Sequence, residues 1–240
     1  MQQLSPVAQA IYSGPKFLVS DTETVGFKPP PQPASGIVEI AWTELDPVTL
    51  EIKEVRCERT NPGCKIDPSA SAVHDIYDGD VIDKPLVQDV FKPEGPVVIV
   101  GHNVPFDLKF MSPYIENLAG TLCTWELAKK HIRGTKNHKL QTLIAEFSLE
   151  AGDAHSAGGD VIGCVSFIKY LQDLTGMTML EMYEAAKKPC IYHTMPFGKH
   201  AGKAMKDVPM GWMDWYMDQD PESSDRNLRL TIEQQRKLRA

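Results

Sequence analysis

Three features that often define a protein's class are missing from this 240-residue chain. No apolar stretch approaches the roughly 20 residues that a membrane-spanning helix needs. The first residues do not combine a basic region with an apolar core, so we expect no secretory signal. The five cysteines are scattered and include no C-x-x-C pair. Such cysteines are typical of reduced thiols rather than of disulfides or a zinc site. We therefore expect a cytoplasmic protein without membrane contact.

Positive charge is scarce as well, because 25 Lys and Arg stand against 32 Asp and Glu, for a formal net charge of -7. The imbalance lies in residues 1–180, with 15 basic and 23 acidic residues, whereas residues 181–240 carry 10 and 9. This argues against a charge-driven DNA coat protein. It does not exclude a nuclease, since metal ions held by carboxylates reverse the field where a phosphate must sit.

The hydrophobic pattern predicts strands and helices that alternate after an initial hairpin. We expect strands at 16–20, 37–42, 50–59 and 97–100, and helices at 112–118, 124–131, 140–147, 156–174 and from Thr178 to before Pro189. Asp46-Pro47 predicts the turn of an antiparallel hairpin. Four prolines make 26–36 a loop, either a surface insertion or a substrate-handling segment. The fold class is α/β, with a mixed sheet flanked by helices.

Two carboxylates close the first strand. Asp21 and Glu23 are two residues apart, so their side chains project from the same face of the strand. Carboxylates held this close repel one another unless a positive charge lies between them. A divalent cation is the usual solution, because hard cations take oxygen ligands.

The strand at 97–100 leads into a second group of polar residues. Pro105 suits the first turn of a helix, which would place Asp107 early in that helix. Ligands in α/β sheets gather outside the carboxyl ends of the strands, so Asp107 and Asp21 can meet there. Alternatively, Asn103 caps the helix and Asp107 only complements its dipole.

A third group precedes the longest predicted helix. Only small residues, Ser156 to Gly159, separate His155 from Asp160, so another segment could approach closely. If His155 lies in the loop before the helix, it can share a cleft with Asp160. Imidazole titrates near neutral pH and can take a proton from water. A histidine here could equally be structural or solvated.

Together the three groups resemble the motifs of the DEDDh, or DnaQ-like, 3′–5′ exonuclease family, in the same order and with similar spacing. The resemblance extends from about Lys16 to Leu174 and rests on these segments: Asp21-x-Glu23-Thr24, Ile37-Val38-Glu39-Ile40-Ala41, Val73-His74-Asp75-Ile76, His102-Asn103-x-x-Phe106-Asp107 and His155-x-Ala157-x-x-Asp160. It implies an RNase H-like fold and hydrolysis of nucleic acid from 3′ ends, with release of nucleoside monophosphates.

The resemblance also implies the roles of the site residues. Asp21, Glu23, Asp107 and Asp160 would hold two Mg²⁺ ions, for which Mn²⁺ could substitute, and His155 would be the general base. The implied substrate-binding residues are Thr24, His74, Asn103 and Phe106. For His74, a surface histidine in a turn remains the alternative.

The composition changes after Pro189. Phe197-Gly198-Lys199, Gly202-Lys203 and Trp215 resemble the module that follows the nuclease domain in the exodeoxyribonuclease X group. We expect a tail at 1–15, a nuclease domain at 16–176, a connecting helix at 177–189 and this module at 190–240. The module either contacts nucleic acid or is a small helical domain with Trp212 and Trp215 in its own core.

The resulting prediction is a metal-dependent 3′–5′ exodeoxyribonuclease that acts on single-stranded or duplex DNA ends in repair or replication, with unidentified protein partners. Two alternatives remain. One is an exoribonuclease similar to RNase T or oligoribonuclease, because the motifs do not reveal whether a 2′-hydroxyl is recognised. The other is a non-catalytic polymerase-accessory protein that binds nucleic acid.

Overall fold

A computed structural model describes residues 14–220 and 224–239. The expected tail, 1–15, therefore lies almost entirely outside the described residues. The chain divides into two compact units, with the division between Ala186 and Lys187, and each unit is described separately below. Within the described residues, no helix combines the length and the apolar character needed to cross a membrane.

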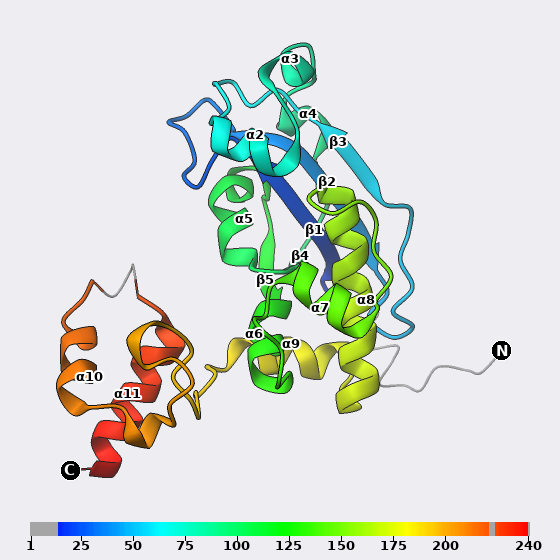
Figure 1. Cartoon of the computed structure of the whole chain (residues 1–240). Coiled ribbons are helices and arrows are strands. Elements are labelled where there is room, and N and C mark those ends of the chain that lie inside the picture. Colours follow the sequence, from blue (N-terminus) through cyan, green and yellow to red (C-terminus); the bar gives the residue numbers. More distant parts are fainter. Residues whose placement is uncertain (1–13, 221–223, 240) are drawn as a thin grey trace. The chain divides into compact units, whose positions relative to one another are not determined.

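The first unit is built on a mixed five-stranded sheet (Figure 1). Its strands are β1 (Lys16–Thr24), β2 (Ile37–Leu45), β3 (Arg56–Arg59), β4 (Val97–Gly101) and β5 (Leu118–Cys123). Their order is β3-β2-β1-β4-β5, in which β1–β2 and β2–β3 are antiparallel and β1–β4 and β4–β5 parallel. The central strand, β1, thus pairs on both sides, and the predicted α/β class is confirmed.

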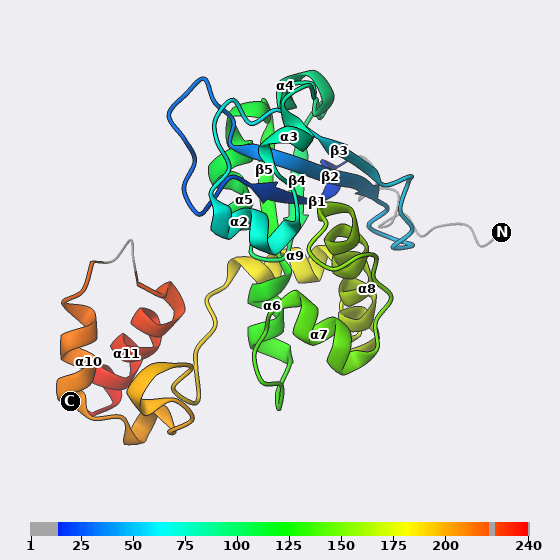
Figure 2. The ribbon, with the colours of Figure 1, turned by 45° about the horizontal axis from the view of Figure 1, so that its top comes forward.

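Helices cover both faces of this sheet. Successive side chains of a strand point to opposite sides, and β1 carries apolar side chains on both sides, so each face packs against helices. Phe17 and Val19 of β1 face one core, whereas Leu18 between them faces another. The first core includes side chains of α6 (Thr124–His131), α7 (Leu140–Phe147), α8 (Ala157–Thr175) and α9 (Met179–Lys187). The second includes side chains of α4 (Val87–Val90) and α5 (Val104–Met111). Figure 2 shows α7 and α8 side by side.

Two short helices complete the first unit beside the strand ends. They are α2 (Pro68–His74) and α3 (Asp78–Val81). The predicted helix from Thr178 is α9, and its capping box is present: Thr178 N–H donates to Glu181 Oε2 at 2.8 Å. The Glu181 N–H donates back to Thr178 Oγ1 at 3.3 Å. Met179 and Met182 are fully buried in the first core, so α9 packs as part of the first unit.

Two predicted elements were wrong. The strand expected at 50–59 is confined to Arg56–Arg59, with an isolated bridge between Leu45 and Ile52. The helix expected at 112–118 is only a 3₁₀ turn at Ser112–Tyr114, and the chain then enters β5, which was not predicted. β5 has little local strand character, since Gly120 interrupts it. Parallel pairing with β4 and packing of Gly120 against Tyr183 determine this strand instead.

The second unit has a small core of its own. It contains two 3₁₀ turns, Gly198–His200 and Met205–Asp207, and two helices, α10 (Met210–Met217) and α11 (Arg226–Arg239). Its buried core residues are Met195, Met205, Val208, Met213, Tyr216, Leu228 and Ile232. Trp212 packs against this core, but Trp215 is 54% exposed. The alternative that places both tryptophans in the core of a small helical domain therefore holds for Trp212 but not for Trp215.

Candidate active site

Three carboxylates converge where β1 meets the start of α8. Asp21 and Glu23 project from the face of β1 that also carries Phe17 and Val19, which is the face that α8 covers. Asp160 lies in the first turn of α8. One carboxylate oxygen from each residue lies within 4.8 Å of the others. The sheet face and the helix start thus bring together three of the four predicted metal ligands.

This cluster favours protonation unless a cation is bound. Loss of surrounding water, and then the negative charges of Asp107 and Asp160, raise the pKa of Asp21 well above its usual range. Burial and the charge of Asp160 likewise raise the pKa of Glu23 to about 8. Burial raises the pKa of Asp160 to about 6. Closely spaced oxygen ligands without a compensating positive charge fit a divalent metal ion.

The fourth carboxylate, Asp107, approaches from α5 on the other side of β1. It is buried and accepts hydrogen bonds from Thr22, at 3.2 Å from N–H and 2.7 Å from Oγ1. Burial raises the pKa of Asp107 to about 7, although the Thr22 hydrogen bonds act in the opposite direction. Asp107 lies outside the group of three, yet it is the charge that most strongly raises the pKa of Asp21.

Two residues outside the predicted set of site residues hold the start of α8 in place. Glu39 of β2 is buried, and its carboxylate accepts a hydrogen bond from the Ala157 N–H at 3.0 Å. Gln141 of α7 donates to Asp160 Oδ1 at 2.5 Å. Glu39 also faces Arg59 at 3.6 Å. Alternating strand positions could have placed Glu39 on the same face as Glu23, whereas nothing local indicates Gln141.

The small residues before Asp160 allow the close approach that was predicted. A Cβ at Gly159 would lie 2.0 Å from the backbone oxygen of Asp153, so no larger residue fits there. The approaching segment is the loop just before α8. Ser156 caps the helix by accepting from the Gly159 N–H at 3.1 Å.

His155 lies in the turn before α8, as one reading of the sequence required. Its side chain is exposed and its backbone is left-handed, with φ of 59°. Burial raises the pKa of Asp160. Of the two influences that lower this pKa, the charge of His155 is larger than the hydrogen bond from Gln141. The imidazole is therefore within electrostatic reach of the cluster while remaining open to solvent.

A pocket of about 200 Å³ adjoins the carboxylates and gathers three of the four predicted substrate-binding residues. Its lining includes Glu23, Thr24, His74 and Phe106, together with the 81% exposed Phe27 from the proline-rich loop. Asn103 is not among the lining residues. It occupies the N-cap position of α5 with φ of 75°, but its side chain makes no capping hydrogen bond.

His74 is buried, so the alternative of a solvated surface histidine was wrong. Its Nδ1 accepts from the Ile76 N–H at 3.1 Å, which leaves Nε2 to carry the proton of the neutral ring. Nε2–H then donates to the Thr24 carbonyl at 3.2 Å. His74 thereby ties α2 to the end of β1 and fixes one wall of the pocket.

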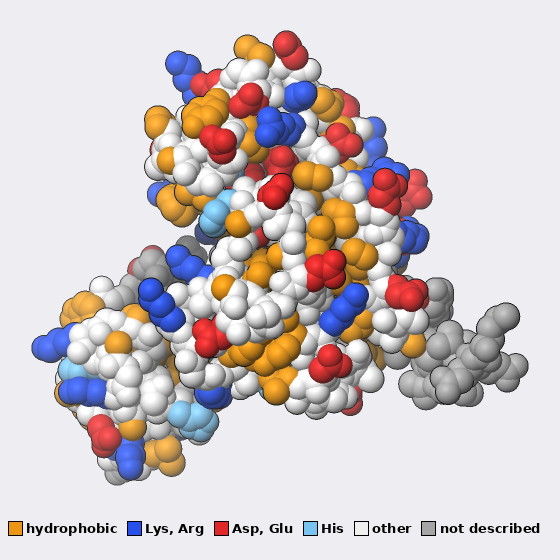
Figure 3. All heavy atoms as spheres, turned by 45° about the vertical axis from the view of Figure 1, so that its right-hand side comes forward, with side chains coloured by type: hydrophobic (Ala, Val, Ile, Leu, Met, Phe, Trp, Pro, Cys, Tyr) orange, Lys and Arg blue, Asp and Glu red, His pale blue; other side chains and the backbone are white. Residues whose placement is uncertain are grey.

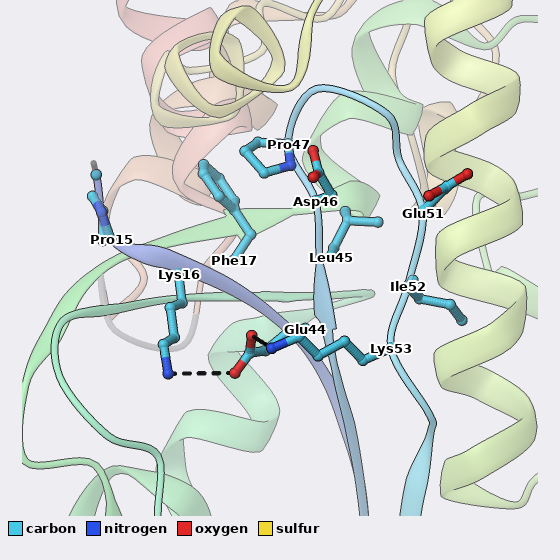
Figure 4. Close-up of a pocket in the computed structure, with 11 residues that line it drawn as sticks. Pro15, Lys16, Phe17, Glu44, Leu45, Asp46, Pro47, Glu51, Ile52 and Lys53 are labelled. Carbon is cyan, nitrogen blue, oxygen red and sulfur yellow. Dashed lines mark hydrogen bonds and ion pairs between the residues drawn. The ribbon is translucent and has the colours of Figure 1, made fainter. Parts of the chain in front are cut away.

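A second hollow, of about 430 Å³, lies at the opposite end of β1 (Figure 4). There Glu44 lies between Lys16, at 3.4 Å, and Lys53, at 2.5 Å. Glu44 thus offsets part of the charge of the two lysines, and no group of metal-binding side chains lies beside them in the described part of the chain. Among the described residues, the one group of acids close enough to hold a metal ion lies at the carboxyl end of β1.

Comparison with known proteins identifies the class. A family model described as "Exonuclease" matches residues 18–166, more than half of the chain, so the chain belongs to this exonuclease family. Together with the relatives below, this match makes the protein a 3′–5′ exonuclease with an RNase H-like fold. A second model, described as a putative quorum-sensing-regulated virulence factor, matches residues 186–224.

Among individual proteins, the chain is similar to Exodeoxyribonuclease 10 of Escherichia coli K12. The two are 29% identical over 222 residues, which cover 89% of this chain and 96% of the relative. DNA polymerase III subunit epsilon of Aquifex aeolicus is 28% identical over 170 residues, covering 66% of this chain and 81% of that protein.

Solved structures agree with this assignment. Exonuclease X in complex with 5′ overhanging duplex DNA has a TM-score of 0.58 at 25% identity, covering 71% of this chain and 99% of that one. Escherichia coli exonuclease I bound to a dT13 oligonucleotide shares the fold, with a TM-score of 0.55 at 17% identity. That match covers 68% of this chain and 42% of exonuclease I.

Proposed function

We propose that the protein is a metal-dependent exodeoxyribonuclease that removes nucleoside 5′-monophosphates from DNA 3′ ends. The supporting observation is the group of three carboxylates within 4.8 Å of one another beside a pocket of about 200 Å³. DNA is the proposed polymer because Exodeoxyribonuclease 10 aligns over most of both chains and exonuclease X is seen with duplex DNA.

Asp21, Glu23 and Asp160 hold the metal ions in this proposal, and Asp107 contributes directly or through water. Two Mg²⁺ ions, for which Mn²⁺ can substitute, would supply the charge that activates water and neutralises the departing 3′-oxygen. His155 takes one proton from the attacking water, the water oxygen bonds to phosphorus, and the bond from phosphorus to the 3′-oxygen breaks. The departing oxygen is protonated from solvent.

The adjoining pocket receives the terminal nucleotide. Phe106 and Phe27 offer rings on which a base can stack, and stacking tolerates any base because every base has a π-face. His74 does not need to touch the substrate, since both of its nitrogens are engaged with backbone. It keeps the end of β1 in the position that carries Glu23 and Thr24. Asn103 is exposed at the start of α5 and does not line the pocket. In this proposal it contacts the substrate only outside the pocket.

The test is digestion of 5′-labelled single-stranded DNA, duplex DNA and RNA of one sequence, with Mg²⁺ and with chelator. We expect ladders shortened from the 3′ end with DNA and Mg²⁺, and none with chelator. Asp21→Asn should abolish the ladders, whereas Asp173→Asn, an exposed acid further along α8, should not. Faster digestion of RNA than of either DNA would contradict the choice of substrate, and digestion in chelator would contradict metal dependence.

A further inference from the structure

The second unit presents a fixed loop on its surface. The segment 194–204 is closed by a bridge between Thr194 and Ala204, and the Met195 N–H donates to the Lys203 carbonyl at 2.7 Å. The Gly202 N–H donates back to the Met195 carbonyl at 2.9 Å. Gly198 and Gly202 have φ of 74° and 79°, and a Cβ at either would meet nothing within 4 Å. These glycines are needed for the turn and leave the backbone open.

This loop is a region of unbalanced positive charge. The stretch 192–206 contains no Asp or Glu, but it contains Lys199, Lys203 and Lys206, all of which are exposed. Among the described residues, no side-chain hydrogen bond or ion pair engages these three lysines. Lys199 directly precedes the buried His200 and Lys203 follows it by three residues; after desolvation, the charges of these lysines lower the pKa of His200. Figure 3 shows Lys and Arg side chains spread over the visible face of the unit.

Aromatic rings continue from this loop across α10. His200 meets Trp212 edge to face at 5.7 Å, and Trp212 stacks on Tyr216 at 5.3 Å. The ends of this ring cluster reach solvent, since Phe197 is 43% exposed and Trp215 54% exposed. The ring centroids of Phe197 and Tyr216 are 6.3 Å apart, and those of Trp215 and Trp212 are 5.9 Å apart. The packed inner rings thus support two exposed outer rings: Phe197, two residues before Lys199, and Trp215 on α10.

We propose that these five residues, Phe197, Lys199, Lys203, Lys206 and Trp215, form a docking surface for single-stranded DNA. This lysine–aromatic surface would bind the strand outside the pocket where cleavage occurs. The choice of DNA rests on the proposed function of the first unit. The surface itself indicates a polyanionic ligand that also carries planar rings. Exposed cations without acidic partners attract phosphates, and exposed rings supported from below stack unpaired bases.

The acidic residues near this surface do not cancel its charge. Asp214 of α10 is 2.5 Å from Arg236 of α11 and is therefore compensated within the unit. Asp207 follows the loop and Asp218 follows Trp215 by three residues; both are exposed, so three lysines stand against two uncompensated acids. An acidic protein segment would also meet the lysines, but it would have no bases to place on Phe197 and Trp215. The nucleobases therefore distinguish single-stranded DNA, the proposed ligand, from an acidic protein segment.

The experiment measures binding of the full-length protein to a fluorescent 20-nucleotide oligothymidylate in chelator, where no hydrolysis occurs. The variant Lys199→Gln/Lys203→Gln/Lys206→Gln is compared with Lys84→Gln/Lys92→Gln/Lys169→Gln, which removes three exposed lysines of the first unit. We expect the first to bind on the order of 10- to 100-fold more weakly near 0.1 M salt, with the salt slope lower by about 2. The control triple should bind like wild type.

The rings are tested separately with Trp215→Ala and an abasic oligonucleotide of equal length. Trp215→Ala should weaken oligothymidylate binding roughly tenfold, leave the salt slope unchanged and have no effect on abasic binding. Equal losses for both lysine triples would show attraction by net charge only and overturn the proposal. A Trp215→Ala variant that binds oligothymidylate normally would also overturn it, as would wild-type protein that binds polyglutamate as tightly as oligothymidylate.

The same preparations separate this proposal from the proposed function. If wild type digests DNA and the loop triple binds normally, only the docking surface is refuted. If wild type digests no DNA but the loop triple loses binding, the docking surface stands and the exodeoxyribonuclease assignment fails. Circular dichroism of each variant excludes loss of folding as the cause of weaker binding.

Discussion

The two units present opposite charges to the same proposed polymer. The first gathers Asp21, Glu23 and Asp160 within 4.8 Å and partly removes them from water, while the second exposes lysines and rings. Acids this close favour a metal ion, which then supplies positive charge at one point, where a bond breaks. Exposed lysines supply diffuse charge without that chemistry. Net charge therefore does not identify a nucleic-acid enzyme, since in these proposals the two units bind phosphate through different groups.

Loss of one metal-binding carboxylate should have the greatest consequence. Asp21→Asn removes a ligand at the centre of the cluster and should lower kcat by at least about 10³-fold, in the range that loss of a charge-stabilising group produces. Binding of oligothymidylate in chelator should be unchanged, because the lysine–aromatic surface is intact. Parallel rate and binding measurements provide the test, and a variant that keeps wild-type turnover would refute the site.

The next effect separates metal binding from proton transfer. His155→Ala should lower turnover by about 10²- to 10⁴-fold, the usual contribution of a general base. The carboxylates remain, so the Mn²⁺ affinity measured by calorimetry should stay within about threefold of wild type, too little to indicate a lost ligand. His193→Ala, an exposed histidine of the second unit, is the matched control. Loss of Mn²⁺ binding in His155→Ala would make His155 a ligand instead of a base.

A smaller effect is expected from the residue that holds α8 against the sheet. Glu39→Ala leaves the Ala157 N–H without its acceptor, which should cost about 1–3 kcal/mol of folding stability and lower kcat about tenfold by displacing the start of α8. Glu39→Gln keeps an acceptor oxygen and should restore kcat. Denaturant unfolding and steady-state kinetics measure both. A glutamine variant as slow as the alanine variant would show that the charge, not the hydrogen bond, matters.

A further expected effect, on stability and not on turnover, is the pH dependence of folding without metal. The pKa values of Glu23, about 8, and Asp160, about 6, are raised in the folded state, so the folded chain binds protons more tightly than the unfolded one. This stability is present at pH 4 and is lost as pH rises towards 8, by on the order of 2–4 kcal/mol. Thermal unfolding in chelator should show Tm falling from pH 5 to 8.

Added Mg²⁺ should reverse this trend, raising Tm more at pH 8 than at pH 5.5, because the ion binds the deprotonated cluster. Glu23→Gln should flatten the chelator profile, whereas Glu181→Gln, at an exposed capping box, should leave its slope unchanged. A Tm that rises with pH in chelator would contradict the raised pKa values.

Much of the nuclease unit could be predicted because its local and global signals agree. The run before Asp21 is apolar and becomes the central strand, and the three-and-four spacing after His155 becomes α8. Spacing within one strand already places Asp21 and Glu23 on one face. The motifs, once compared with a family, then indicate that Asp160 must return to the same place.

Other features depend on tertiary contacts that no local pattern encodes. β5 forms because β4 offers a parallel partner, although Gly120 weakens its own strand tendency. Gln141 reaches Asp160 only because α7 packs beside α8. The exposure of Trp215 was equally hidden, since tryptophan is highly buried on average and this one stands beside the buried Tyr216. The proposed docking surface depends on this distinction between exposed and buried rings.

The most direct test is a crystal structure with Mn²⁺ and a nucleoside 5′-monophosphate, with the metal located by anomalous scattering. The account predicts two peaks roughly 3.5–4 Å apart, bounded by Asp21, Glu23 and Asp160, with the nucleotide base beside Phe106 and the His155 ring facing the phosphate. Manganese bound away from these carboxylates, or a base lying outside the pocket of Thr24 and His74, would contradict it.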